Sequence, residues 1–152
     1  MNRRKRFRVG LHPLYLPIYD ALCAQLADEW QPFFGLRTFE QQDTLYAQGR
    51  SVPGAVVTDA RGGESAHNYG CASDWTFFEN GNPVWLPIND PHWKTYEAAC
   101  EKAKARWGGT FPKPDYFHNE LPIEVRWPKV FEAFQSGSWE SADQVIRKAV
   151  VT

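Results

Sequence analysis

The sequence predicts an α+β fold, in which a small antiparallel sheet is flanked by helices. Segments with helical periodicity are mixed with short runs of β-branched and aromatic residues, without the regular strand-helix alternation of a parallel sheet. The 152 residues suffice for one domain with a hydrophobic core. Aromatic residues make up 15% of the chain, enough to fill such a core and to line a groove.

The first third of the chain predicts helix, strand and helix. Leucine and isoleucine recur every fourth residue between residues 14 and 26, which indicates a helix from Pro13 to about Trp30. The run FFGLRTF, residues 33–39, predicts a short strand. A second helix is expected over residues 40–48, where Gly49 can end it.

The middle of the chain predicts two more strands and a helix. The strands are GAVVTDA, residues 54–60, and CASDWTFF, residues 71–78. Asp90 and Pro91 are typical of a helix start, and we expect that helix to run to about Trp107, before two glycines.

The last third predicts an irregular segment followed by helices. Two prolines make residues 111–118 irregular or a short strand. Two helices are expected to finish the chain, the last beginning near Ser141, where Ser141 and Gln144 can form a capping box.

The charge is unevenly distributed although the formal net charge is −1. Five of the seventeen basic residues lie between Arg3 and Arg8, so we interpret residues 1–10 as a basic tail and 11–152 as a single domain. Such a tail could attract nucleic acid, lipid headgroups or cell-wall polymers, and a solvated tail without a specific function is an equal alternative. The interior has no stripe of basic and aromatic residues, so no nucleic-acid partner is expected.

Targeting and redox signals are weak. The basic start is not followed by an uninterrupted apolar run, so we expect no signal peptide, and no segment is apolar enough to span a membrane. The three cysteines form no CxxC pair, which argues against a disulfide framework and a structural cysteine-zinc site.

The stretch ESAHNYGCASDW, residues 64–75, brings a histidine and an aspartate together among small residues. On an ideal strand His67 and Asp74 would point to opposite faces, because they are seven residues apart. Gly70 can break that strand, which would place His67 on a loop and Asp74 on the following strand. Asp74 would then share a face with Ala72 and Thr76, and Cys71 would point away. Such a pair can serve in hydrogen bonding, which is the more common role, or in metal binding, which is the more specific hypothesis.

A catalytic zinc ion commonly has three protein ligands. His12 and His92 lie at expected helix starts, which explains them structurally, so His118 is the best third candidate. Asp115 precedes it by three residues and is a candidate general base. A turn or bulge near Tyr116 is required to bring the two side chains to one side.

Three elements of the sequence, in order, resemble the zinc D-alanyl-D-alanine carboxypeptidases and L-alanyl-D-glutamate endopeptidases, which include VanY-type enzymes and phage endolysins. SAHNYGCASD matches the family pattern S-x-H-x-x-G-x-A-x-D, and DYFH matches its acid-x-x-His element. Upstream, GLRTFEQQDTLYAQGR resembles the family's arginine-containing strand and following helix. The similarity covers roughly residues 11 to 121 and implies the fold shared by these peptidases and their hedgehog-like relatives.

The resemblance implies one zinc ion held by His67, Asp74 and His118. It also implies Asp115 as the catalytic acid and base, and Arg37 as the residue that steadies the substrate carbonyl and its oxyanion.

Two further residues resemble those that line the family's substrate cleft, namely Gln42 and Ser65. Without the resemblance, Arg37 would be interpreted as a surface ion pair, Gln42 as an exposed helix residue and Ser65 as a turn residue.

The sequence departs from the family pattern around His118. That histidine is often preceded by proline and followed by an aromatic residue and glutamate, whereas here Phe117 precedes it and Asn119-Glu120 follows. The groups that orient His118 are therefore expected to differ. Glu120 is an alternative base, although it lies on the wrong side of the histidine for the pattern.

The resemblance implies a zinc-dependent peptidoglycan peptidase whose partner is the cell-wall stem peptide. We expect a monomeric phage endolysin that cleaves the L-alanyl-D-glutamate bond and stays in the host cytoplasm until it is released to the periplasm and cell wall. D-alanyl-D-alanine carboxypeptidase activity is the alternative reaction. A non-catalytic zinc domain that binds the wall is the alternative of another class, and an intact acid at Asp115 argues against it.

Overall fold

A computed structural model describes residues 2–152. The chain divides into two compact units: residues up to 36 with 70–122, and residues 37–69 with 123–152. The first unit holds the sheet and the second holds most of the later helices. Within residues 2–152, no helix combines the length and the apolar character needed to cross a membrane.

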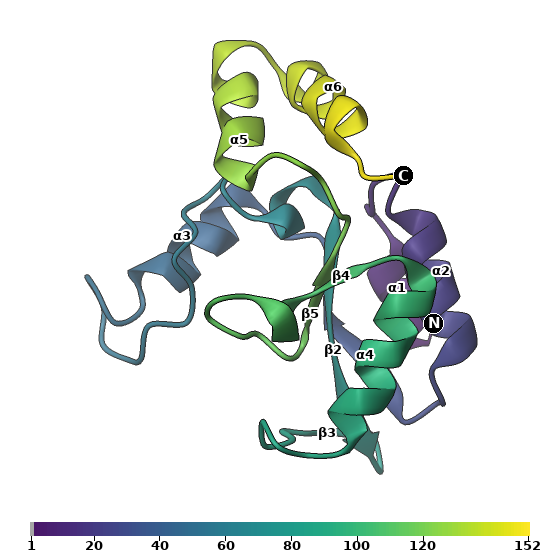
Figure 1. The fold of residues 1–152 in the computed structure, drawn as a ribbon. Coiled ribbons are helices and arrows are strands. Elements are labelled where there is room, and N and C mark those ends of the chain that lie inside the picture. The colour runs from purple at the N-terminus through teal and green to yellow at the C-terminus, as the bar shows by residue number, and fades with distance from the viewer. Residues whose placement is uncertain (1) are drawn as a thin grey trace. The chain divides into compact units, whose positions relative to one another are not determined.

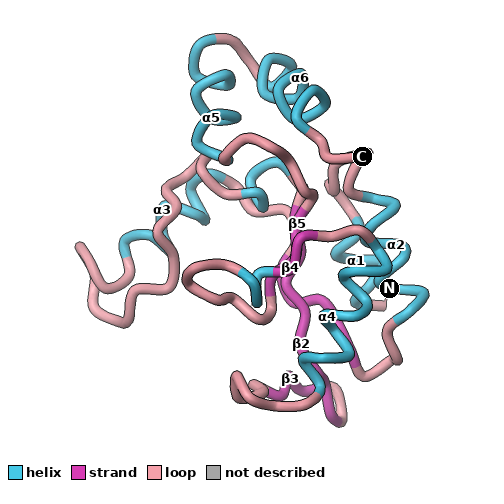
Figure 2. The backbone as a smooth tube through the Cα atoms, viewed as in Figure 1, coloured by secondary structure: helices cyan, strands magenta, loops and turns pink. Residues whose placement is uncertain are grey.

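The first unit is built on five antiparallel strands (Figures 1 and 2). The central strand β2 (Ala72–Glu79) pairs with β1 (Trp30–Phe34), β3 (Asn82–Val84) and β5 (His118–Glu120), and β4 (Arg106–Trp107) pairs with β5. The α+β class with a small antiparallel sheet is confirmed. Strands β3, β4 and β5 are only two or three residues long, which explains why the sequence pattern does not reveal them.

Helices α2 (Leu16–Gln25) and α4 (His92–Ala103) pack against each other in the first unit. Aromatic side chains of these elements contact one another: the rings of Trp30 and Tyr96 stack at 5.2 Å, and Tyr19 lies 5.5 Å from Trp75. These residues are fully buried or nearly so. The aromatic richness of the sequence is thus largely used in the core.

Residues 3–8, which the sequence suggests are part of a basic tail, form helix α1 (Arg3–Arg8). The Arg4 guanidinium donates hydrogen bonds to main-chain carbonyls at the end of α2 and beyond, including those of Cys23 and Trp30. Arg8 forms a two-bond ion pair with Asp20. Two of the basic residues, Arg4 and Arg8, therefore form hydrogen bonds and an ion pair within the first unit. The division into a tail and a single domain at residue 11 stays a prediction.

The second unit holds α3 (Phe39–Ala47), the 3₁₀ turn η1 (Ala66–Tyr69), α5 (Trp127–Ser136) and α6 (Trp139–Ala149). Aromatic rings of this unit form a cluster of edge and stacked contacts, in which Tyr69 and Trp127 are buried and Trp139 stays exposed. Its members are Phe39, Tyr69, Trp127, Phe131, Phe134 and Trp139. Thr38 and Gln41 form a capping box at the start of α3. The two C-terminal helices and the helix over residues 40–48 are confirmed.

Several predicted boundaries are wrong. Residues 54–60, which the sequence predicts to be a strand, form none and are mostly exposed. Helix α4 ends at Ala103 rather than near Trp107, since Lys104 adopts a left-handed conformation and residues 106–107 join the sheet. Helix α6 begins at Trp139, and no side-chain cap forms at Ser138. The helix predicted over residues 13–30 covers only Leu16–Gln25. The strand predicted over residues 33–39 begins earlier, at Trp30, and ends at Phe34.

Candidate metal centre

Two of the three predicted ligands face each other across neighbouring strands. Asp74 on β2 and His118 on β5 are directly paired, so their side chains lie on one face of the sheet. The His118 Nδ1 atom is 3.1 Å from Asp74 Oδ1, and both residues are buried. Asp74 lies on β2 between Ala72 and Thr76, each two residues away, so the three share a face of the strand, as the alternation of side chains predicts.

His67 lies outside the strand, in η1, and Gly70 separates it from β2. Gly70 has φ of +66°, and a Cβ there would lie 2.5 Å from the Gly10 carbonyl oxygen. Only glycine suits this left-handed conformation and close approach. The Ser65 hydroxyl accepts a hydrogen bond from the main-chain N–H of His67 at 3.3 Å. The expected break between His67 and the strand is confirmed.

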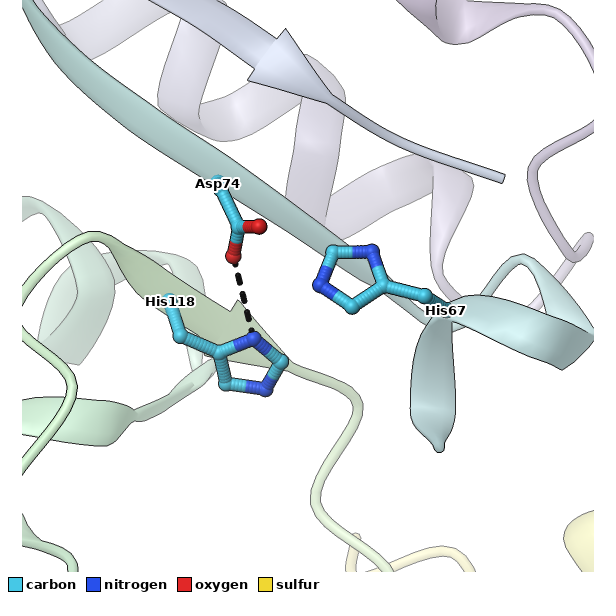
Figure 3. A group of neighbouring side chains, drawn as sticks. All are labelled: His67, Asp74 and His118. Atoms are coloured by element: carbon cyan, nitrogen blue, oxygen red, sulfur yellow. Dashed lines mark hydrogen bonds and ion pairs between the residues drawn. The ribbon is translucent and has the colours of Figure 1, made fainter. Parts of the chain in front are cut away.

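His67, Asp74 and His118 form a buried cluster in which one ligand atom from each lies within 4.8 Å of the others. Figure 3 shows the two imidazole rings and the carboxylate converging on one another. Two imidazoles and one carboxylate are the donor set of many catalytic zinc sites, and they also accept other divalent ions. The residues therefore fit a metal ion. Cys71 is buried but is not part of the cluster.

His118 has a second carboxylate neighbour. Its Nε2 atom lies 2.9 Å from Glu120 Oε2, and Glu120 is buried as well. Burial acts to lower the pKa of His118, but the hydrogen bonds and charges of Asp74 and Glu120 act in the other direction and raise the pKa to about 10. The imidazole is thus held between two acceptors, one on each side of the ring.

Asp115 and His118 lie at the two ends of a tight turn. The His118 N–H donates to the Asp115 carbonyl at 3.2 Å, and the Asp115 N–H donates to the Gly108 carbonyl at 2.9 Å. Asp115 itself is exposed. The turn that the sequence requires near Tyr116 is confirmed, since it comprises residues 115–118.

The second unit holds Arg37 and Gln42 in a defined contact. The Arg37 guanidinium donates to Gln42 Oε1 at 2.8 Å, and Gln42 Nε2 donates to the Ala60 carbonyl at 2.9 Å. Gln42 is almost fully buried, so it is not the exposed helix residue that the helical pattern alone suggests. The Arg37 main-chain N–H donates to the His67 carbonyl at 3.0 Å, which links the arginine directly to a candidate ligand.

Asn68 is a supporting residue that the sequence pattern does not single out. Its side-chain oxygen accepts from the main-chain N–H groups of Gly63 and Ser65, and its nitrogen donates to the carbonyls of Arg37 and Thr38. It is buried and joins the two segments that carry Arg37 and His67. Its position between two specified residues of the motif gives no chemical signal of this role.

Known proteins resemble both the sequence and the fold. The family described as D-alanyl-D-alanine carboxypeptidase matches residues 58–121. The peptidoglycan L-alanyl-D-glutamate endopeptidase CwlK of Bacillus subtilis is 36% identical over 122 residues, and the alignment covers 73% of each chain. The chain belongs to this peptidase family. The predicted resemblance is thereby confirmed, and so is the assignment of the chain as a peptidase.

The fold resemblance extends further than the matched segment. The L-Ala D-Glu endopeptidase ChiX of Serratia marcescens superposes with a TM-score of 0.53 at 23% sequence identity, covering 79% of this chain and 86% of that one. The family match spans Ser65, His67, Asp74, Asp115 and His118. Peptidases of this family are metal-dependent, in agreement with the buried cluster.

Proposed function

We propose that the chain is a zinc-dependent peptidoglycan endopeptidase that hydrolyses the L-alanyl-D-glutamate bond of the stem peptide. The observation that carries the proposal is the buried convergence of His67, Asp74 and His118. The choice of bond is supported by CwlK, the relative that is 36% identical and is an endopeptidase of this specificity.

His67, Asp74 and His118 would hold the ion through two imidazoles and one carboxylate, and His118 would release its extra proton when the ion binds. When bound, a zinc ion supplies Lewis acidity that polarises the scissile carbonyl and activates a water molecule. Asp115 is exposed at the end of its turn, so its carboxylate is open to water and substrate. It takes a proton from the attacking water and gives it to the leaving amine.

Arg37 would stabilise the negative charge that develops on the carbonyl oxygen, because a fixed guanidinium is most effective where charge appears. Gln42 restrains that guanidinium through its side-chain oxygen. Gln42 and Ser65 are proposed to line the substrate cleft. For Ser65 this would add to the hydrogen bond that its hydroxyl accepts from His67.

Product analysis tests this proposal. Purified peptidoglycan is digested with zinc-loaded protein, and the released ends are identified by mass spectrometry. New N-terminal D-glutamate ends, lost with a chelator and regained with zinc, are expected. The Asp115→Asn variant serves as a folded control with the metal ligands intact.

The competing reaction is removal of the terminal D-alanine, which the description of the matching family favours. Free D-alanine in place of D-glutamate ends would identify it. A folded, zinc-loaded protein that releases neither product would leave the non-catalytic wall-binding domain as the remaining function.

The biological setting is a further part of the proposal: a monomeric phage endolysin, held in the host cytoplasm until it reaches the wall. Expression inside a bacterium with and without a pore-forming protein tests it. Lysis only when the pore is present is expected, and lysis without the pore would contradict the setting. Light scattering of the purified protein checks the monomer.

A further inference from the structure

Glu120 is a buried carboxylate for which the catalytic scheme has no role. One of its oxygens, Oε2, lies 2.9 Å from His118 Nε2, and the other, Oε1, lies 3.4 Å from the Arg106 guanidinium. Glu120 is 6% exposed and is not a member of the metal-ligating cluster. An ionised carboxylate in such a place requires partners, and His118 and Arg106 supply them.

Strand geometry places this carboxylate beside the histidine. His118 and Glu120 are two residues apart on β5, so their side chains share a face. Across the sheet, Glu120 pairs with Ala72 on β2 and with Arg106 on β4. The small methyl group of Ala72 leaves room for the Glu120 side chain to turn toward the imidazole, while Arg106 holds its far oxygen.

The imidazole of His118 has an acceptor at each nitrogen. Nδ1 points toward Asp74 and Nε2 points toward Glu120. A neutral imidazole carries one proton, and the partner of one nitrogen decides which nitrogen keeps its lone pair. We propose that Glu120 is a positioning residue that holds the proton of His118 on Nε2 and so leaves the Nδ1 lone pair for the metal ion. This inference rests on the proposed metal site.

The same contacts argue against Glu120 as the general base. Nε2 and Nδ1 lie on different sides of the ring, so Glu120 faces the side away from Asp74. To accept a proton from water at the metal, Glu120 would have to abandon both His118 and Arg106.

Metal affinity tests the proposal without relying on turnover. Zinc dissociation constants are measured by competition with a chelator for wild type, Glu120→Ala and Glu120→Gln. Loss of the carboxylate is expected to weaken zinc binding about 10- to 100-fold. Glutamine should weaken binding less than alanine, because its amide oxygen can still accept from Nε2–H. The control is Glu101→Ala, which removes an exposed carboxylate from α4 and should leave the affinity unchanged.

The proton position gives a second, independent test. In zinc-loaded protein labelled with ¹⁵N at histidine, long-range ¹H–¹⁵N correlation spectra should show the His118 proton on Nε2. The Glu120→Gln variant should retain it, and also serves if Glu120→Ala does not fold. A His118 proton on Nδ1 in the loaded wild type would overturn the proposal.

The outcomes separate the two proposals. If wild type binds one zinc ion and Glu120→Ala binds it equally well, Glu120 does not position the ligand, whether or not turnover or thermal stability falls. A complete loss of turnover at full zinc occupancy would then identify Glu120 as the base. If wild type binds no zinc, the proposed function fails, and the role of Glu120 fails with it.

Discussion

The two faces of the β2–β5 strand pair use polar residues in opposite ways. One face carries Asp74, His118 and Glu120, which are charged or titratable groups directed at one another. The other face carries Ser73 and Asn119, which are neutral. Both faces are buried, so exposure does not distinguish them.

The neutral face satisfies its polar atoms internally. Tyr15 donates to Asn119 Oδ1 and lies 2.6 Å from the Ser73 hydroxyl. The Asn119 amide donates to the Ser73 carbonyl and to the Tyr96 hydroxyl oxygen, and Tyr96 donates to the Phe117 carbonyl. The network thus ends one residue before His118. A closed neutral network stabilises a fold, whereas the charged cluster of His67, Asp74 and His118 has the donor set to hold a metal ion.

The largest effect is expected at Asp115. Replacing it with asparagine removes the proton carrier while the metal ligands remain, so turnover should fall about 10²- to 10⁴-fold, or about 3–5 kcal/mol. Zinc affinity and thermal stability should be unchanged, since Asp115 is exposed. Turnover on peptidoglycan and zinc titration of the same preparation measure this. Activity within tenfold of wild type would mean that another residue carries the proton.

Asn119→Leu tests the neutral face. Without the amide, the buried hydroxyls of Tyr15 and Tyr96 lose partners, and unfolding free energy should fall by about 2–4 kcal/mol. Urea denaturation measures the loss. Asn82→Leu is the matched control, because Asn82 is exposed on β3 and should cost less than about 0.5 kcal/mol. Equal losses in both variants would show that the network contributes nothing special.

Gly108→Ala tests the turn over residues 115–118, which precedes β5 and contacts Gly108. A Cβ at Gly108 would overlap the Asp115 carbonyl oxygen and lie 3.0 Å from the His118 Cβ. Overpacking of this kind should cost about 1–3 kcal/mol of stability and lower turnover by displacing Asp115. Thermal unfolding and turnover together check this. If Gly108→Ala has the unfolding temperature and the turnover of wild type, the turn accommodates the added methyl group without displacing Asp115.

Tyr15→Phe should have the smallest effect. It removes one hydroxyl from the neutral network and leaves Asn119 Oδ1 short of a donor, so about 1–2 kcal/mol of stability should be lost. Zinc affinity should not change, because the charged face keeps all its groups. A large drop in zinc affinity would show that the two faces are more tightly coupled than the hydrogen bonds indicate.

The sequence reveals local features of the β2–β5 pair but not the pairing itself. The strand after Gly70 and the side of it that Asp74 occupies follow from alternation and from a glycine that can adopt positive φ, and both are confirmed. The pairing of Asp74 with His118 could not be derived that way, because β5 is three residues long and follows two prolines. The two segments were connected instead by setting aside the other histidines, which left His118 as the third ligand, and by the resemblance to a family.

Other features could not be predicted from the sequence because they depend on contacts between distant residues. The run Val56-Val57 is apolar and β-branched, but residues 54–60 do not join a sheet and are mostly exposed. The support that Asn68 gives to Arg37 depends on a hydrogen bond between residues 31 positions apart. The position of Glu120 beside His118 required knowing that both lie on one strand. In each case the missing information is a tertiary contact.

The most direct test of the account is to titrate metal-free protein with zinc while recording bound zinc and turnover on peptidoglycan together. The account predicts that both saturate at one ion per chain along the same curve. Turnover that persists in fully metal-free protein, or zinc that binds without restoring turnover, would contradict the assignment of His67, Asp74 and His118 as the catalytic metal site.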